Sequence, residues 1–331
     1  MKKIHHARIV TVIAALAATL GGCIHQYPDG DGVDPTLVNV QLHVTLDGEP
    51  ATLAPADKGR AGATTTRRLV VEIRRDGETV DRQTIVNHVD SAGKITFPVT
   101  FRLHALDYTL VAWSDLGKTP DGGDLHYNTA NLNLVTRATP YTGNTTATDC
   151  FRRSTRIDLR DYRDWNTFLD DNIQLERPVA RYKLVATDVA AFLESTRQQR
   201  ADGETYTVTV NHDFYLPLAI NALTGKLARS EMQVSFTAPL TVENNGSGEC
   251  LVVHDFIFAG DSESYIPLTI EIRDSSGKGI SRTTGINVAY KRGHVTTLRG
   301  RFLTGRFDTG IGINPDFDDE DINIDLDGKN R

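Results

Sequence analysis

Cys23 is the residue whose chemistry the sequence predicts most clearly. It follows Leu20 and two glycines, and its side chain carries a thiol. Three of the first eight residues are lysine or arginine, and an uncharged run over residues 9–20 separates them from Cys23. A basic start, a short apolar stretch and small residues are typical of a secretory signal peptide, and the apolar stretch is shorter than the roughly 20 residues that span a membrane. The sequence therefore predicts that residues 1–22 are removed and that Cys23 receives lipid. An ordinary signal peptide with an incidental cysteine is the alternative.

The composition limits the kinds of partner. The chain has a formal net charge of −7, and loss of residues 1–22 removes three more positive charges. Nucleic acid favours basic surfaces, so we expect no nucleic-acid partner. Besides Cys23 the chain contains Cys150 and Cys250, which lie 100 residues apart, and the sequence leaves open whether they pair.

The sequence lacks the common motifs of catalytic sites. There is no His-Glu-x-x-His, no Gly-x-Ser-x-Gly and no phosphate-binding loop. Apart from His5 and His6 in the predicted signal peptide, the histidines are scattered singly. We therefore expect a protein that is not an enzyme and that uses no cofactor and no metal. An acidic run at residues 316–321 could bind a divalent cation, but a solvated flank is the favoured interpretation.

Alternating apolar residues predict the elements of the chain. The first such strand is followed by a polar loop over residues 49–66, and its apolar members are Val38, Val40, Leu42, Val44 and Leu46. Arg60 lies in this loop and Arg67 and Arg68 open the next strand, so all three are candidate sites for a protease. Ile322, Ile324 and Leu326 predict a short terminal strand.

Short strands recur along the rest of the chain, which is typical of an all-β protein. The exceptions are a short helix predicted over residues 160–171 and a convincing helix that begins at Thr187 or Asp188. A hairpin is predicted over residues 286–303. The mature chain exceeds the size that one hydrophobic core usually organises, so two domains are expected. The predicted divisions are a signal peptide (1–22), a tether (23–35), an N-terminal domain (36–177), a C-terminal domain (178–305) and an acidic tail (306–331).

Several motifs together resemble a known family. They are the lipid-attachment site, the strand at 107–115, the junction at 175–180, the helix start at 187–188 and the run from 206 to 225. In these stretches the chain is similar to the fimbrillin-type lipoproteins of Bacteroidales, which include major subunits and FimB-type anchors. The resemblance implies an all-β fold with minor α: two tandem transthyretin-like β-sandwich domains, with one helix in the second. It also implies a lipid-anchored, surface-exposed place in the cell outer membrane and a role in a type V pilus, or fimbrium.

The family resemblance also implies a mechanism of assembly. An arginine-specific protease would cut at Arg60, Arg67 or Arg68, the strand from Val38 to Leu46 would leave, and an extended segment of another fimbrial subunit would take its place. The segment from Ile322 to Leu326 is the candidate donor. The sequence leaves open whether the loop is cut and whether the chain is an anchor, a polymerising or a tip subunit, with a host or bacterial receptor.

A second interpretation is a surface lipoprotein that binds glycan or another ligand for an outer-membrane uptake system. Such sites need exposed aromatic side chains, and the N-terminal domain offers Trp113, Trp165, Tyr127, Tyr141 and Tyr162. Core packing is the simpler explanation for Trp113.

Overall fold

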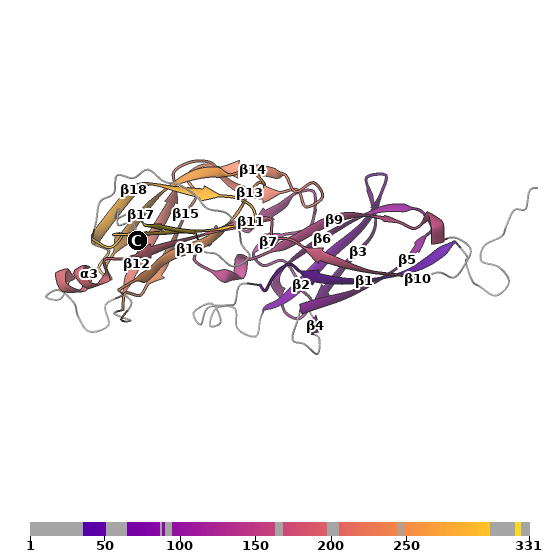
Figure 1. Ribbon diagram of the computed structural model, residues 1–331, viewed down its shortest axis with the longest axis horizontal. Helices are drawn as coiled ribbons and strands as arrows, with labels where there is room; N and C mark the ends of the chain where they lie inside the picture. Colours follow the sequence, from indigo (N-terminus) through magenta and orange to yellow (C-terminus); the bar gives the residue numbers. More distant parts are fainter. Residues whose placement is uncertain are drawn as a thin grey trace, which may run out of the picture.

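The computed structural model describes residues 36–50, 65–86, 88–89, 95–162, 168–196, 205–243, 246, 248–304 and 322–325. Within these residues the chain consists of strands, a few short helical turns and one α-helix, α3 (Val189–Thr196). Figure 1 shows an elongated molecule with β1, β5 and β10 towards one end and α3 at the other. The predicted all-β class with a minor α component is confirmed. Cys23, Arg60, Trp165 and Leu326 lie outside the described residues.

Two sheets in the first half of the chain face each other and form what we call the first sandwich. One has the order β10-β1-β5-β4 and the other β3-β2-β6-β9. The strands of the first sheet are β10 (Phe168–Leu175), β1 (Leu37–Leu46), β5 (Ile95–His104) and β4 (His88–Val89). Those of the second are β3 (Glu78–Val86), β2 (Thr65–Arg75), β6 (Asp107–Lys118) and β9 (Phe151–Asp158). Alternate apolar side chains of both sheets, such as Leu42, Ile73 and Phe97, fill the space between them.

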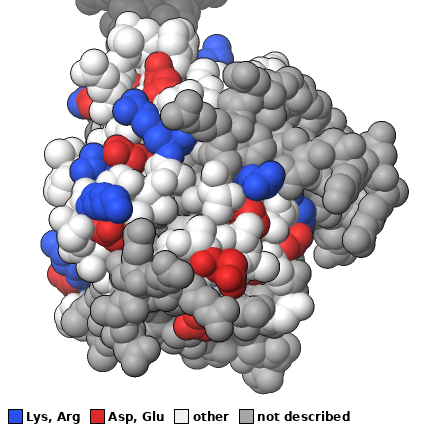
Figure 2. All heavy atoms as spheres, turned by 90° about the vertical axis from the view of Figure 1, so that its left-hand side faces the viewer, with Lys and Arg blue, Asp and Glu red and all other residues white. Residues whose placement is uncertain are grey.

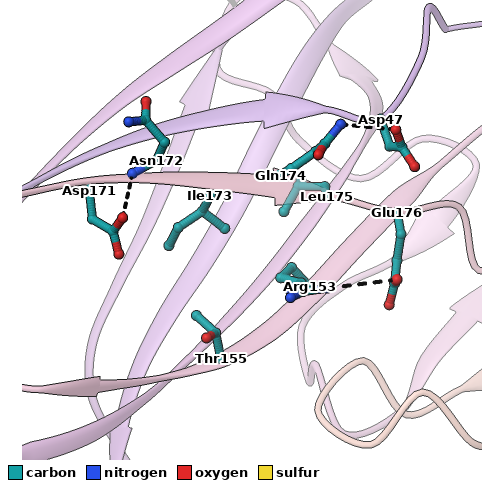
Figure 3. Close-up of a pocket in the computed structure, with 9 residues that line it drawn as sticks. All are labelled: Asp47, Arg153, Thr155, Asp171, Asn172, Ile173, Gln174, Leu175 and Glu176. Carbon is teal, nitrogen blue, oxygen red and sulfur yellow. Dashed lines mark hydrogen bonds and ion pairs between the residues drawn. The ribbon is translucent and has the colours of Figure 1, made fainter.

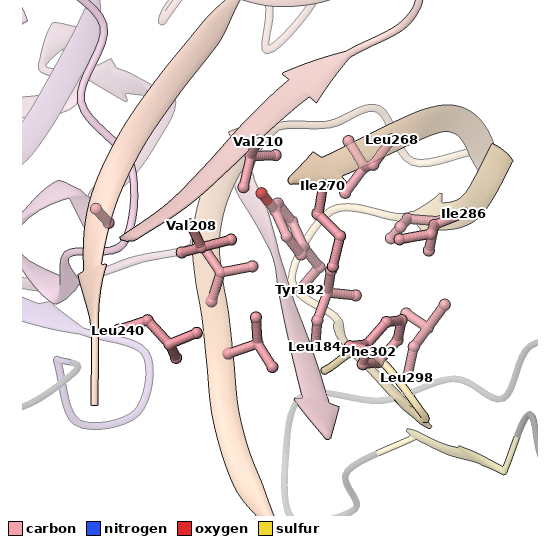
Figure 4. Close-up of a cluster of buried hydrophobic side chains, with 14 of the residues drawn as sticks. Tyr182, Leu184, Val208, Val210, Leu240, Leu268, Ile270, Ile286, Leu298 and Phe302 are labelled. Atoms are coloured by element: carbon pink, nitrogen blue, oxygen red, sulfur yellow. The ribbon is translucent and has the colours of Figure 1, made fainter. Parts of the chain in front are cut away.

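The second half of the chain forms a second sandwich. Its sheets have the orders β16-β11-β19-β20 and β15-β12-β17-β18. The first consists of β16 (Cys250–Phe258), β11 (Val179–Ala186), β19 (Val295–Gly300) and β20 (Ile322–Asp325). The second consists of β15 (Ser235–Leu240), β12 (Tyr206–His212), β17 (Ser264–Arg273) and β18 (Gly279–Tyr290). Figure 4 shows Tyr182 and Leu184 of β11 among the apolar side chains of the facing strands, including Val208 and Ile270.

The two sandwiches repeat one arrangement. In each, the first strand (β1 or β11) pairs in parallel with the last strand (β10 or β19) and antiparallel with a third strand (β5 or β16). In each facing sheet, the second strand (β2 or β12) also lies between two antiparallel neighbours. The sandwiches differ beyond the last strand, because β20 pairs in parallel with β19, whereas β10 is an edge strand of its sheet among the described residues.

A fifth sheet joins the two sandwiches. Its order is β14-β13-β8-β7, formed by β14 (Leu227–Glu231), β13 (Leu216–Ile220), β8 (Val135–Arg137) and β7 (Tyr127–Asn128). The first two strands come from an insertion in the second sandwich and the other two from an insertion in the first. Beneath it lies a separate apolar cluster that takes Trp113 from β6, Ile220 from β13 and Phe258 from β16. The sandwiches therefore share a sheet and a core as well as a linker.

A buried polar cluster lies at the same junction. Arg137 donates to the Tyr127 hydroxyl at 3.1 Å and to the Thr142 carbonyl at 2.9 Å, and its guanidinium lies 3.7 Å from the Asp255 carboxylate. Tyr141 donates to the same carboxylate at 2.5 Å. Burial raises the pKa of Asp255 to about 6, against the opposing effect of Arg137. The cluster thus ties the first insertion to β16 through buried charged groups.

The helix predicted over residues 160–171 is wrong at its C-terminal end. A short 3-10 turn covers Arg160–Tyr162, but β10 begins at Phe168 and pairs in parallel with β1 along its whole length. Asp171 stands at the position where an alternating strand would carry an apolar residue, because that side of β10 faces an open groove. The missing alternation concealed the strand.

The hairpin predicted over residues 286–303 is also wrong. β18 pairs with β17, whereas β19 pairs with β11 and β20. The turn at residues 291–293 therefore carries the chain from one sheet of the sandwich to the other. A hairpin and such a crossing have the same alternation of apolar residues on both sides of a turn, so the pattern alone does not separate them.

Candidate strand-binding site

The first strand of the chain occupies the centre of the first sandwich. β1 lies between β10, which is parallel to it, and β5, which is antiparallel. Its inward side chains are almost completely buried, with exposures of 0 to 4%: Val38, Val40, Leu42, Val44 and Leu46. Gln41 and His43 lie on the other face, where His43 approaches Asp170 at 3.1 Å. Loss of β1 would therefore leave a slot with unpaired main-chain groups on both walls.

The end of β1 is tied to the junction between the sandwiches by Arg177. Its guanidinium donates to the carbonyl of Glu49 at 2.5 Å, and it forms a two-pronged pair with the Asp149 carboxylate at 3.0 and 3.1 Å. It also lies over the Phe151 ring, 4.6 Å from the ring centre. Sequence reasoning marked residues 176–178 only as a junction, because a single arginine carries no signal of a distant partner.

Arg67 and Arg68 are placed where a protease would not reach them in the folded chain. Both belong to β2, which pairs with β3 and β6, and they are only 6% and 2% exposed. Arg67 donates to the Asp149 carbonyl at 2.9 Å, and Arg68 donates to both carboxylate oxygens of Asp115, at 2.6 and 3.1 Å. The third candidate, Arg60, lies outside the described residues.

A groove of about 300 Å³ runs along the outer edge of β10. Figure 3 shows Asp171, Ile173 and Leu175 of β10 on one wall and Arg153 and Thr155 of β9 on the other. The two strands meet only at one end, where Arg152 and Glu176 exchange main-chain hydrogen bonds at 2.8 and 2.9 Å. Beyond that bridge the sheets of the sandwich diverge. The groove thus lies at the edge of the same sheet that contains β1.

The groove combines charged walls with a sheet edge that has no further partner strand in the described part of the chain. The outer edge of β10 offers main-chain donors and acceptors to another strand. Asp47, Asp171 and Glu176 supply negative charge, and Arg153 lies 3.8 Å from Glu176. In the second sandwich the equivalent edge is covered by β20, which places Ile322 opposite Thr296 and Ile324 opposite Leu298. The predicted donor segment thus forms a strand within this chain, and its pairing here is with β19.

The four described aromatic residues that were proposed for ligand binding do not form an exposed platform. Trp113 and Tyr127 are 0% and 1% exposed and pack edge to face, with ring centres 5.3 Å apart. Tyr141 and Tyr162 are partly buried against the two sandwich cores. These contacts explain the four described residues by packing, whereas Trp165 lies outside the described residues.

Three other features would indicate a function: a metal site, a membrane-spanning helix and a basic surface for nucleic acid. The described part of the chain contains no group of three or more His, Cys, Asp or Glu side chains arranged for a metal ion. None of its helices combines the length and apolar character that crossing a membrane requires. Figure 2 shows that lysine and arginine are interspersed with aspartate and glutamate over the described surface at one end of the molecule. Such mixed charge gives no basic patch for nucleic acid on that face.

The comparison that assigns the chain to a family covers nearly its whole length. Residues 33–329 match the model of a family of unknown function, DUF6562. The chain belongs to this family. No match to a curated protein was found for the DUF6562 chain.

Several solved structures are similar to the DUF6562 chain at low identity. One is the fimbrial anchor protein Mfa2 from Porphyromonas gingivalis, with 14% identity, a TM-score of 0.39, and coverage of 75% of this chain and 83% of that one. A proposed cell adhesion protein from Bacteroides uniformis has 12% identity, a TM-score of 0.41, and coverage of 83% and 94%. A proposed polysaccharide-binding protein from Bacteroides thetaiotaomicron has 10% identity, a TM-score of 0.42, and coverage of 75% and 80%.

Proposed function

We propose that this chain is a structural, non-catalytic component of a type V pilus, brought to the cell outer membrane as a lipoprotein acylated at Cys23 and released from that anchor when β1 is removed. Its first sandwich would exchange β1 for an extended segment of another pilus subunit. The observation that carries the proposal is the position of β1, a single strand at the centre of a sheet with its apolar face fully buried. The candidate cut after Arg60 lies between β1 and β2, so cleavage there would separate β1 from the rest of the chain.

The energetics of burial support exchange rather than simple loss. Each of the five inward side chains contributes about 1.5 to 3 kcal/mol through burial. The vacated slot would also expose main-chain groups of β5 and β10 that need new partners. A strand with the same alternation of apolar residues restores both the apolar burial and the main-chain hydrogen bonds. Pockets for its alternate side chains fix its register. The open state would therefore be short-lived until another subunit supplies a strand.

The C-terminal segment is the candidate donor. Residues 322–325 pair as a strand with β19, which shows that the segment adopts the extended form that a donor requires. In the proposed assembly this segment leaves its own sheet and enters the slot of a neighbouring subunit.

Heating of protein sheared from the cell surface tests the proposed assembly. Multimers held by exchanged strands are expected to withstand detergent at room temperature and to separate into monomers on boiling, because they are non-covalent but kinetically stable. On electrophoresis the unheated sample should show a ladder of multimers, and the heated sample should show a monomer band. A single monomer band in both samples, together with retention of the protein on insoluble polysaccharide, would instead support a glycan-binding lipoprotein.

A further inference from the structure

Among the described residues, the outer strand of the fifth sheet is an open edge. β14 pairs with β13 on one side and ends the sheet order on the other. Its residues are exposed on both faces from Leu227 to Ser230, and only Glu231 is partly covered. Figure 1 shows β14 along the upper outline of the molecule. An edge that carries unpaired main-chain groups is a template for another strand.

The pairing with β13 fixes which main-chain groups of β14 point outward. Ser230 lies opposite Pro217. Proline has no amide hydrogen, so this pair is not one of those that exchange two hydrogen bonds in an antiparallel ladder. The amide and carbonyl of Ser230 therefore point away from β13, towards the open edge, where they can form a hydrogen-bonded pair with a second strand.

The charges on β14 identify the strand that fits. Arg229 and Glu231 flank Ser230 and form an ion pair on the same face of the strand. We propose that β14 pairs antiparallel with β14 of a second copy of this chain, about a two-fold axis through Ser230. This arrangement places Arg229 of each copy opposite Glu231 of the other, and opposite charges directly across an antiparallel pair stabilise it. Any other register puts these charges out of line.

Apolar side chains next to the edge add to the surface that dimerisation covers. Met232 is 51% exposed, and in the proposed register it lies opposite Ala228 of the second copy. Phe214 and Tyr215 precede β13 and are 53% and 51% exposed, with their rings in contact edge to face at 5.3 Å. They stand where the chain enters β13, at the same end of the sheet as Met232. The interface involves neither β1 nor the groove beside β10, so it is independent of strand exchange.

Cysteine cross-linking tests the proposed axis. Hydrogen-bonded antiparallel pairs have Cα atoms about 5.5 Å apart, which a disulfide spans. In a chain with Cys23→Ser and Cys250→Ser, we expect Ser230→Cys to form a covalent dimer on mild oxidation. Ala228→Cys is the matched control, because its two copies would be about 13 Å apart along the ladder. Cross-linking captures the contact even though an interface this small is expected to be weak in solution.

Charge variants of the Ser230→Cys chain decide between a specific pair and random collision. Arg229→Glu alone places two glutamates opposite each other and should slow dimer formation at least about threefold, as should Glu231→Arg alone. The double variant restores opposite charges in the same register, so its rate should return to that of the parent. All four positions used are exposed or partly exposed, and thermal unfolding checks that each variant folds. Equal cross-linking of Ser230→Cys and Ala228→Cys, or a double variant as slow as either single one, would overturn the proposal.

Discussion

Cleavage after Arg60 and removal of the fragment that contains β1 are expected to unfold the first sandwich, and a peptide of residues 37–46 is expected to refold it. The lost burial, at about 1.5 to 3 kcal/mol for each of five side chains, is comparable to the 5 to 15 kcal/mol by which whole domains are usually stable. Hydrogen exchange of the β5 and β10 amides is the direct measurement, because both strands lose their ladder with β1.

The control for this experiment is a peptide that keeps the length but not the apolar face. Val40 and Val44 are replaced by aspartate in the control peptide, which puts charges where the structure has fully buried side chains. The parent peptide should restore slow exchange and the control should not. If the cleaved chain keeps slow exchange in β5 and β10 without any peptide, β1 is not required for the fold and the slot does not form.

Asp255→Ala is expected to destabilise the chain by about 3 to 5 kcal/mol at pH 8, because it leaves the Arg137 guanidinium buried without its carboxylate. The same change removes the acceptor of the Tyr141 hydroxyl. Because the folded-state pKa of Asp255 is raised to about 6, the stability linked to its protonation is present at low pH and lost as the pH rises through 6. A measurement at pH 8 therefore compares the variant with a parent chain in which the Asp255 carboxylate is ionised. The free energy of unfolding in urea gives the effect.

Two matched changes separate the buried pair from ordinary ion pairs. Asp107→Ala removes the carboxylate partner of the exposed Arg156, 2.6 Å away, and surface pairs of this kind contribute little to stability. The double variant Arg137→Met with Asp255→Leu removes both buried charges. Its free energy of unfolding should fall by less than that of Asp255→Ala. A double variant that loses as much as the sum of both single variants would show that the two groups do not interact.

Much of the fold follows from alternation alone. β1 and α3 have regular patterns, so they were predicted at nearly their observed positions. β10 was missed because Asp171 replaces the expected apolar residue beside a groove. The fifth sheet was missed for a different reason. Its strands come from two insertions about 80 residues apart, and β7 and β8 are too short to show a period.

The candidate site was predicted in part, and the limits are physical. Five alternating apolar residues identified the inward face of β1, but no local pattern reveals that the strand lies between β5 and β10. Arg67 and Arg68 resembled accessible basic residues at the start of a strand. Their burial depends on Asp115 and Asp149, which are distant in the sequence. Arg177 was hidden in the same way, because its partners are the end of β1 and the loop before β9.

The most direct measurement is the N-terminus of the protein recovered from sheared surface material and from outer-membrane fractions, together with its intact mass. Exchange of β1 after cleavage at Arg60 predicts an N-terminus at Ala61 in the sheared material, in multimers that still protect the β5 and β10 amides. An N-terminus at acylated Cys23 in every fraction would contradict the exchange of β1, and the chain would then be a lipoprotein that keeps its first strand.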